Sequence, residues 1–423
     1  GLGDVYKRQA INNRLVEWER IYGCDTSEDT FSLRLKGIIK RAYEQSGRQV
    51  VLLVDEYDSP MLDSNNNEEL QAEIRGIMRD FFSPLKAQGE YLRFLFLTGI
   101  SKFSQMSIFS ELNNLQNISM QDAYSAICGI TENELRTQLE EDIRRMAEAN
   151  GETYDEACIH LKQQYDGYHF SENSEDIYNP FSLFNAFAQK KYANFWFSTG
   201  TPTFLIDILQ QSDFDIRQLD GVSATAEQFD APTNVITDPL PVLYQSGYLT
   251  IKGYDEEFGI YSLGFPNREV EEGFIKFLLP FYANTNAVES EFEIQKFVRE
   301  IRIGDYDSFF RRLRSFFADT PYELIRDLEL HYQNVLFIVF KLVGFYVKAE
   351  YHTSEGRIDL VLQTDKFVYV IEFKLDGTAE DALRQINEKH YALPFEAGGN
   401  RRLFKIGVNF NAKMRNIEKW IVE

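Results

Sequence analysis

The chain has 423 residues, which is more than one hydrophobic core usually organises, so we expect two or three domains. Its composition, with 44% hydrophobic and 26% charged residues, excludes an intrinsically disordered protein. No apolar run reaches the roughly 20 residues that cross a bilayer, which indicates a cytoplasmic protein without a membrane contact. The formal net charge of −22 excludes binding of polyanions by the whole surface.

The first predicted feature is a strand-helix-strand unit. Residues 49 to 58, QVVLLVDEYD, place five consecutive apolar residues before two acids, as in a strand that is buried on both faces of a parallel sheet. Residues 91 to 99, YLRFLFLTG, predict a second strand, and the segment between the two predicts a helix that ends near Gly89. Ligands of such a sheet bind beyond the carboxyl ends of its strands, where the two acids lie.

The acids that follow the first strand resemble a Walker B element. In this interpretation Asp55 binds the Mg²⁺ of ATP and Glu56 polarises the attacking water, while Thr98 or Ser101 senses the γ-phosphate. No GxxxxGK(S/T) loop occurs in the chain, and the acids cannot replace the phosphate cradle that this loop provides. Either the chain is truncated at its N-terminus, which the unpatterned first ten residues favour, or its ATPase has degenerated. A plainer alternative is that both acids merely end a buried strand.

The middle of the chain predicts mostly helices. From about Thr131 to Lys191 the pattern is helical, with interruptions at QYDGYHF and YNPFS. Residues 225 to 285 predict a short helix, a hairpin around YDEEFG and a closing helix, which together indicate a small winged-helix-like module.

The last third predicts both helices and strands. Helices are predicted over residues 305 to 317 and 328 to 344, followed by period-two strands in EYHTSEGRIDLVLQTDKFVYVIEFKLDG. Thr378 caps a further helix through about residue 391, and the strand LFKIGVNF precedes a short terminal helix. Residues 295 to 423 contain 20 basic and 19 acidic residues, whereas residues 1 to 294 contain 24 basic and 47 acidic residues. A surface that binds nucleic acid is therefore expected in the last third, where the phosphates meet less repulsion.

Three side chains in this region have the chemistry of a metal-dependent hydrolase. A tight turn near Thr364 and Asp365, with a loop of two or four residues, predicts a hairpin in which Asp359 lies opposite Val370. Glu372 is then a diagonal neighbour of Asp359, and Lys374 shares their face. Carboxylates hold Mg²⁺, which activates water and polarises a phosphoryl oxygen, while a lysine orients the water or stabilises developing charge. The pattern therefore predicts phosphodiester hydrolysis, although a surface charge network is the plainer alternative.

These residues resemble the PD-(D/E)XK nuclease superfamily, whose core is an acid on one strand followed by an E-x-K strand and a helix. The resemblance assigns Asp359 as the first acid and Glu372 with Lys374 as the E-x-K element, so that both carboxylates bind the metal. The flanking helices supply further residues that the resemblance implies, namely Gln385 in catalysis, Tyr391 on the same helix, and Glu329 as an additional acid.

The resemblance extends to a large bacterial family, common in Bacteroidetes, in which an AAA-ATPase-like domain precedes the nuclease domain. It implies an α/β multidomain fold with an incomplete P-loop-type parallel sheet over residues 1–205, a helical and winged-helix-like region over 206–294, and a restriction-endonuclease-like α/β/α domain over 295–423.

The family's expected activity is ATP-linked, Mg²⁺-dependent cleavage of nucleic acid, with DNA as the expected substrate. ATP binding and hydrolysis are expected of the family but not of this chain, because the phosphate loop is missing. Assembly of identical subunits stays open. The alternative function is a signalling or scaffold ATPase-like protein that uses the nuclease fold as a binding module.

Overall fold

The computed structural model of the chain describes residues 2–62, 68–99, 115–197, 205, 208–209, 212, 214–231, 238–282, 287–318, 328–354, 357–375, 377–396, 401–411 and 413–423. Contacts between residues divide the chain into two compact units. Unit 1 comprises Gly1–Ile127, His169–Glu175 and Ser223–Leu263, and unit 2 comprises Cys128–Tyr168, Asp176–Val222 and Gly264–Glu423. The domain boundaries at residues 205 and 294 stay predictions. In the described ranges, no helix combines the length and apolar character needed to span a membrane.

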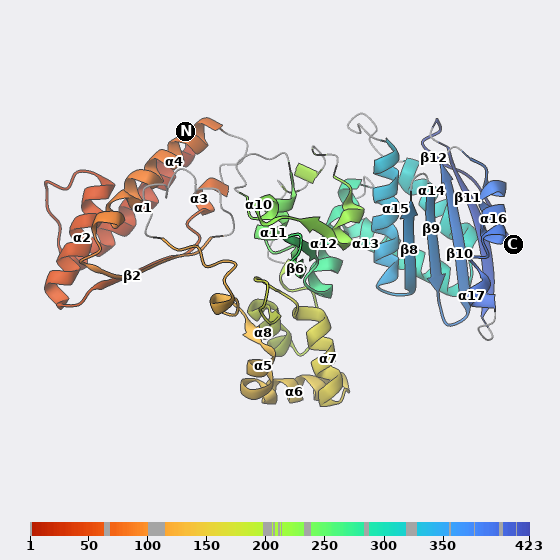
Figure 1. Cartoon of the computed structure of the whole chain (residues 1–423), viewed down its shortest axis with the longest axis horizontal. Helices are drawn as coiled ribbons and strands as arrows, with labels where there is room; N and C mark the ends of the chain where they lie inside the picture. The colour runs from red at the N-terminus through yellow and green to blue at the C-terminus, as the bar shows by residue number, and fades with distance from the viewer. Residues whose placement is uncertain are drawn as a thin grey trace. The chain divides into compact units, whose positions relative to one another are not determined.

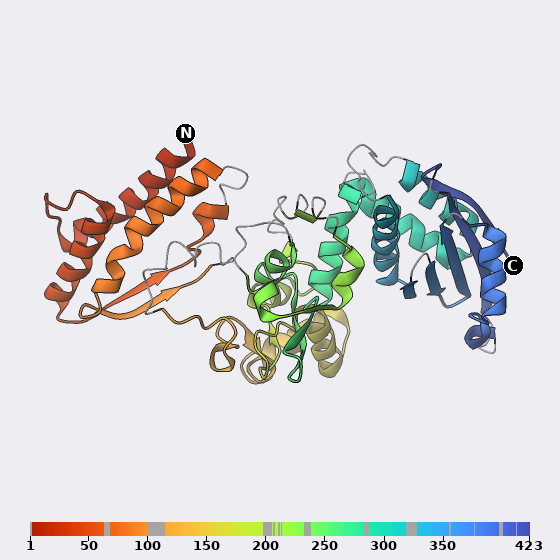
Figure 2. The same cartoon turned by 45° about the horizontal axis from the view of Figure 1, so that its top comes forward.

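Unit 1 contains the predicted strand-helix-strand unit. Its elements are α1 (Leu2–Tyr22), α2 (Phe31–Ser46), β1 (Val50–Val54), α3 (Ser59–Leu62), α4 (Glu68–Phe82), the 3-10 helix η1 (Ser83–Ala87) and β2 (Leu92–Leu97). Strands β1 and β2 pair in parallel, as predicted, and α1, α2 and α4 lie side by side (Figures 1 and 2).

Only one face of this strand pair is covered by the described residues. Leu52 and Val54 of β1 pack against a buried cluster that includes Leu35 of α2. In contrast, Val51 and Leu53 are 54% and 66% exposed. The prediction that this strand is buried on both faces is therefore wrong for the part of the chain that the structure describes, because successive side chains of a strand point to opposite faces and the helices meet one of them.

The remaining part of unit 1 centres on a three-stranded sheet in the order β5-β7-β6. The elements here are η2 (Asp122–Tyr124), β5 (Val222–Ala224), α10 (Ala226–Phe229), α11 (Leu240–Gln245), β6 (Thr250–Asp255) and β7 (Ile260–Gly264). The predicted short helix and hairpin are thus present. Gly259, with a φ of 64°, supplies the left-handed residue of the hairpin turn. The winged-helix-like assignment stays a prediction.

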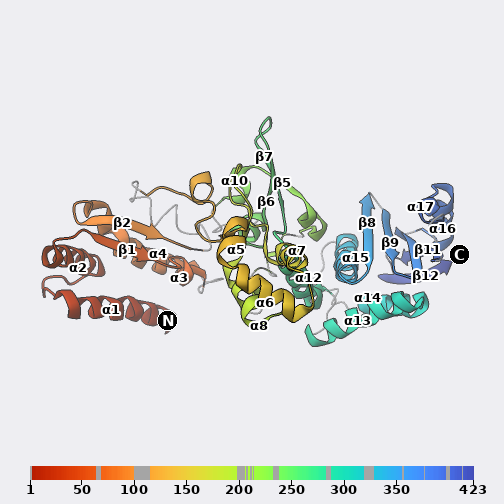
Figure 3. The ribbon, with the colours of Figure 1, turned by 90° about the horizontal axis from the view of Figure 1, so that it is seen from below.

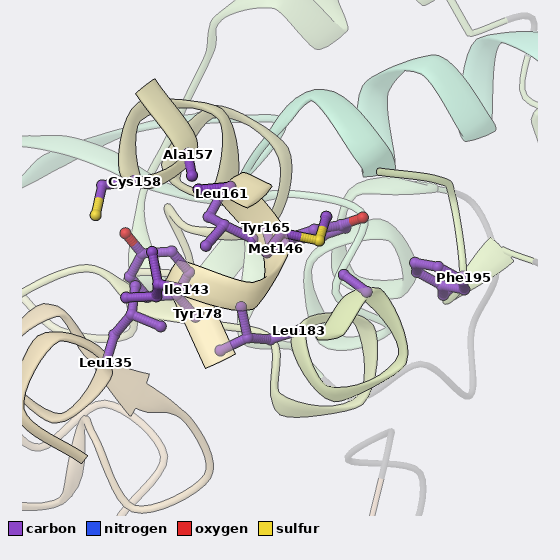
Figure 4. Close-up of a cluster of buried hydrophobic side chains, with 12 residues drawn as sticks. Leu135, Ile143, Met146, Ala157, Cys158, Leu161, Tyr165, Tyr178, Leu183 and Phe195 are labelled. Atoms are coloured by element: carbon purple, nitrogen blue, oxygen red, sulfur yellow. The ribbon is translucent and has the colours of Figure 1, made fainter. Parts of the chain in front are cut away.

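Unit 2 begins with the predicted helical region. Its elements are β3 (Ile130–Thr131), α5 (Glu132–Gln138), α6 (Glu140–Asn150), α7 (Tyr154–Tyr165), β4 (Ile177–Tyr178), α8 (Pro180–Gln189) and the 3-10 helix η4 (Ile216–Asp220). Thr131 and Thr153 begin α5 and α7 with capping boxes, which satisfy backbone N–H groups at the helix starts. The apolar faces meet in one buried cluster around Tyr165 (Figure 4).

The C-terminal part of unit 2 is a sheet with helices. Its elements are α12 (Arg268–Tyr282), α13 (Ala287–Ile303), α14 (Tyr306–Ala318), α15 (Leu328–Gly344), β8 (Lys348–Ser354), β9 (Arg357–Gln363), β10 (Phe367–Leu375), α16 (Ala379–Glu388), α17 (Leu393–Glu396), β11 (Arg402–Asn411) and β12 (Asn416–Val422). In the described residues the five strands follow the order β12-β11-β10-β9-β8. Strands β10 and β11 are parallel, and the other neighbours are antiparallel.

Two expectations for this region are wrong. The terminal segment forms strand β12 rather than a helix, because Ile417 is fully buried and Trp420 stacks on Phe310 with ring centroids 5.6 Å apart. Pairing with β11 outweighs the local propensity of so short a segment. Helix α16 begins after Thr378, as predicted, but it ends at Glu388 and leaves Tyr391 in the following turn.

Helices cover both faces of the central strand β10. On one face the Tyr369 hydroxyl donates to the Ile301 carbonyl of α13 at 2.7 Å, and the ring of Phe373 lies 5.8 Å from that of Phe340 in α15. On the other face Val368 and Val370 pack with residues of α16. Figure 3 shows α14 and α16 on opposite sides of the sheet. This α/β/α layering explains why six of the nine side chains of β10 are buried.

Candidate functional site

The hairpin of β9 and β10 brings the predicted acids together. Its turn residues are Asp365 and Lys366, and the Thr364 N–H donates to the Phe367 carbonyl at 2.8 Å. Asp359 therefore lies directly opposite Glu372 and not opposite Val370, as the predicted turn required. That register was wrong because the turn lies one residue further along the chain. Directly opposed residues point to the same face of a sheet, with β-carbons about 4.5–5.5 Å apart.

Glu372 and Lys374 share this face of β10. Glu372 is completely buried, and the Lys374 side chain is 24% exposed, so the lysine is the more accessible of the two. The Lys374 Nζ lies 3.5 Å from Glu372 Oε1 and donates to Gln385 Oε1 of α16. Because a buried carboxylate is costly unless a cation lies near it, the contact with Lys374 offsets part of the cost of burying Glu372. The structure thus brings three of the four predicted catalytic side chains into one connected group.

The Asp359 side chain lies outside the described residues, so only its backbone position on β9 is known. The same holds for Glu329, which belongs to the first turn of α15. Tyr391 is half-buried and packs against the cluster of Val368, Val370 and the α16 side chains, which fits a structural role.

Helix α16 approaches the sheet closely beside Glu372. Gly407 of β11 is the register neighbour of Glu372, and a β-carbon at this position would lie 2.2 Å from the Ala379 carbonyl oxygen and 2.6 Å from the Leu383 nitrogen. Both are backbone atoms of α16, so a side chain here would displace the helix that carries Gln385. The sequence reasoning missed Gly407, although a glycine inside a strand pattern signals a close backbone approach.

Asn409, the register neighbour of Lys374, is a second residue that the sequence did not reveal. It is 8% exposed, and its Nδ2 donates to Glu418 Oε2 at 2.8 Å. A bulge in β12 leaves Glu418 without a register partner, and Asn411 donates to the same carboxylate oxygen at 2.9 Å. Bulges often re-aim side chains next to active sites. Polar groups therefore extend across β11 from the predicted catalytic face.

The donor set of this face fits a hard divalent cation. Two carboxylate residues occupy opposed positions, one of them fully buried, and Mg²⁺ prefers a few carboxylate oxygens together with retained waters. No group of three or more acidic, histidine or cysteine side chains suited to a metal occurs among the described side chains, which do not include that of Asp359. The fit therefore rests on the opposed pair Asp359 and Glu372.

The predicted nucleotide residues meet at the carboxyl ends of β1 and β2. The Thr98 hydroxyl donates to Asp55 Oδ1 at 2.5 Å, and the Glu56 N–H donates to Thr98 Oγ1 at 3.3 Å. Glu56 has a φ of 51°, a left-handed conformation that is unusual for this residue type and often accompanies functional sites. Ser101 lies outside the described residues. Asp55, Glu56 and Thr98 thus form one connected group.

Comparisons with known proteins match both ends of the chain. The family described as "Predicted AAA-ATPase" matches residues 5–109, which include β1 and β2, and the family described as "PD-(D/E)XK nuclease superfamily" matches residues 327–420, which include Asp359, Glu372 and Lys374. A protein described as "Uncharacterized protein in vnfD 5'region" from Azotobacter chroococcum mcd 1 is 32% identical over 439 aligned residues, covering all of this chain and 82% of that protein. No solved structure matches the chain.

The two matched regions coincide with the two residue groups described above. The first contains the Asp55 and Thr98 pair, and the second contains the opposed acids with Lys374. The similarity to the Azotobacter protein extends over the whole chain and so includes the connecting region. The chain therefore belongs to the family of proteins that combine a predicted AAA-ATPase region with a C-terminal domain of the PD-(D/E)XK nuclease superfamily.

Proposed function

We propose that the protein is a Mg²⁺-dependent nuclease that hydrolyses phosphodiester bonds of DNA. The observation that carries this proposal is the direct opposition of Asp359 and Glu372 on the face where Lys374 contacts both Glu372 and Gln385. An acid on one strand facing an E-x-K element supplies two carboxylates for a cation and an ammonium beside them, which are groups that metal-dependent hydrolysis of a phosphodiester can use.

Each residue has a separate role in this proposal. Asp359 and Glu372 would hold the cation, which when bound polarises a phosphoryl oxygen and lowers the pKa of a water ligand. The Lys374 ammonium stabilises negative charge that develops on the phosphate, and it is the partly exposed member of the group. Gln385 accepts a hydrogen bond from Lys374 and so restrains the direction of the ammonium.

We infer a nucleotide-linked role for the N-terminal region. The contact between Asp55 and Thr98 at the ends of parallel strands supports a site where Asp55 assists a Mg²⁺-bound nucleotide and Thr98 responds to its terminal phosphate. Glu56 is the candidate for polarising the attacking water. The sequence contains no GxxxxGK(S/T) loop, so these residues alone do not make a complete phosphate site.

The alternative is a scaffold protein that uses the nuclease fold to bind a partner without cleavage. An assay of the 423-residue chain on supercoiled plasmid, single-stranded DNA and RNA separates the two functions. We expect cleavage of DNA with Mg²⁺ and none with EDTA. Binding of any of these substrates without Mg²⁺-dependent cleavage would favour the scaffold.

A further inference from the structure

A basic turn lies at the same sheet edge as the proposed active site. Because β10 and β11 are parallel and Leu375 pairs with Phe410, the chain that leaves β11 does so at the end of β10 that carries Lys374. Residues 413–415 of this chain segment, Lys413, Met414 and Arg415, are all exposed. We name these three residues the basic turn. Lys413, its first residue, is at most about 14 Å of extended chain from Asn409, the register neighbour of Lys374, and Arg415, its last, is at most about 21 Å from it.

The basic turn has a defined backbone. Asn411 Oδ1 accepts hydrogen bonds from the Lys413 N–H at 2.9 Å and the Met414 N–H at 3.1 Å. Arg415 has a φ of 55°, a left-handed conformation that reverses the chain before β12. After the turn, Asn416 Nδ2 donates to the Arg314 carbonyl of α14 at 3.0 Å. The backbone that carries Lys413 and Arg415 is therefore held at the edge of the sheet.

A third cation lies close to the basic turn. The Arg314 guanidinium donates to the Glu418 carbonyl at 3.4 Å, four positions after Met414. Arg314 lies on α14, on the side of the sheet opposite α16 (Figure 3), and with Lys413 and Arg415 it places three cations at one end of the sheet in a chain whose formal net charge is −22. A local group of cations on an otherwise acidic molecule is where a polyanion is attracted and held in register. Cations of this kind contact phosphates and carry no sequence preference.

We infer that the basic turn binds backbone phosphates of the nucleic acid within about six nucleotides of the bond cleaved at Glu372 and Lys374. This inference rests on the proposed nuclease function. It also explains how an acidic protein retains a polyanionic substrate, because the attraction is concentrated at the end of the sheet where β10 and β11 finish. The remainder of the surface then contributes little to binding.

The test compares two double variants of the full chain. Lys413→Gln with Arg415→Asn removes both cations of the basic turn, and asparagine tolerates the left-handed backbone at position 415. Lys366→Gln with Lys389→Gln is the matched control, since these exposed lysines lie at the start of β10 and the end of α16. Eight residue steps along β10 separate the two ends of the sheet by about 26 Å.

Binding of fluorescein-labelled duplex and single-stranded DNA is measured in EDTA by anisotropy at several salt concentrations. For duplex DNA we expect the basic-turn variant to bind more weakly, with a slope of log affinity against log salt that is smaller by about 1.8, while the control keeps the wild-type slope. Equal melting temperatures exclude misfolding as the cause. An unchanged slope, or the same loss in both variants, overturns the inference.

The two proposals fail in different ways. If the wild-type chain cleaves DNA with Mg²⁺ but the basic-turn variant keeps its salt dependence, the inference alone is overturned. If the wild-type chain neither binds nor cleaves any of the substrates, the proposed function is overturned and the inference falls with it.

Discussion

Lys374 connects the residues of the proposed active site, because its Nζ contacts both Glu372 and Gln385. Without the Gln385 side-chain oxygen as an acceptor, the Lys374 ammonium is less restrained and adopts more orientations. We therefore expect Gln385→Leu to lower kcat about 10- to 100-fold with little change in KM, since a misdirected charge affects the transition state more than binding. Steady-state kinetics on labelled DNA checks this. Wild-type kcat in the variant would show that Gln385 has no positioning role.

His331 of α15 predicts a pH-dependent stability. Its Nε2 is buried with no hydrogen-bond partner in the described part of the chain, its ring stacks on Tyr282, and burial lowers its pKa from 6.5 to about 4. Between about pH 6.5 and pH 4 the unfolded chain therefore binds a proton at His331 and the folded chain does not. The free energy of unfolding is not reduced by this group above pH 6.5, and it falls as the pH drops through this window.

The expected loss from this single group is about 2 kcal/mol between pH 7 and pH 5. His331→Phe keeps an aromatic ring for stacking but cannot titrate, so its free energy of unfolding should fall by that much less over the same range. Urea unfolding of both proteins at the two pH values measures the difference. Parallel losses in the two proteins would mean that His331 is protonated equally in both states.

At the scale of elements, the close packing of α16 on the sheet depends on Gly407. A methyl group there meets two backbone atoms of the helix, and backbone cannot move aside as a flexible side chain can. We expect Gly407→Ala to destabilise the protein by about 1–3 kcal/mol and to lower cleavage more than 10-fold, because the helix carries Gln385 away from Lys374.

Gly253→Ala is the matched control for this prediction. Gly253 also lies in a strand, but a methyl group at this position would have the Ser262 β-carbon as its nearest neighbour at 4.0 Å, which is ordinary contact. That variant should keep wild-type melting temperature and cleavage. If both glycine variants behave alike in thermal unfolding and in the cleavage assay, the close approach at Gly407 has no special role.

The sequence predicted the elements better than their register. Apolar runs and the Thr378 cap identify β1, β2, α15 and the start of α16, because these signals are local. The β9–β10 register depends on one residue in the turn, and β12 depends on pairing with β11, which no local signal encodes. The acids and the lysine of the site followed from their spacing. Asn409 acts through neighbours distant in sequence, so only the fold revealed it, whereas the glycine inside the β11 pattern was a sequence signal for Gly407 that the prediction missed.

At the scale of the whole molecule, the two ends of the chain differ in what they contain. The C-terminal end has the connected group of the proposed active site, whereas the N-terminal end has the acids and threonine of the proposed nucleotide site and the sequence has no GxxxxGK(S/T) loop. We expect calorimetry to detect no tight binding of Mg-ATP by the 423 residues, because Asp55 and Glu56 act only on a nucleotide already held by its phosphates. Tight, saturable binding would mean that other residues form the phosphate site.

The central claim, that the opposed acids and Lys374 form a nuclease site, is tested most directly by Mg²⁺-dependent cleavage of plasmid DNA with three proteins: wild type, Glu372→Gln and Glu388→Gln. Glu388 is an exposed acid in the last turn of α16 and serves as the control. We predict that wild type and Glu388→Gln cleave at the same rate, while Glu372→Gln loses at least about 100-fold and keeps the wild-type melting temperature. Cleavage by Glu372→Gln at the wild-type rate would contradict the claim.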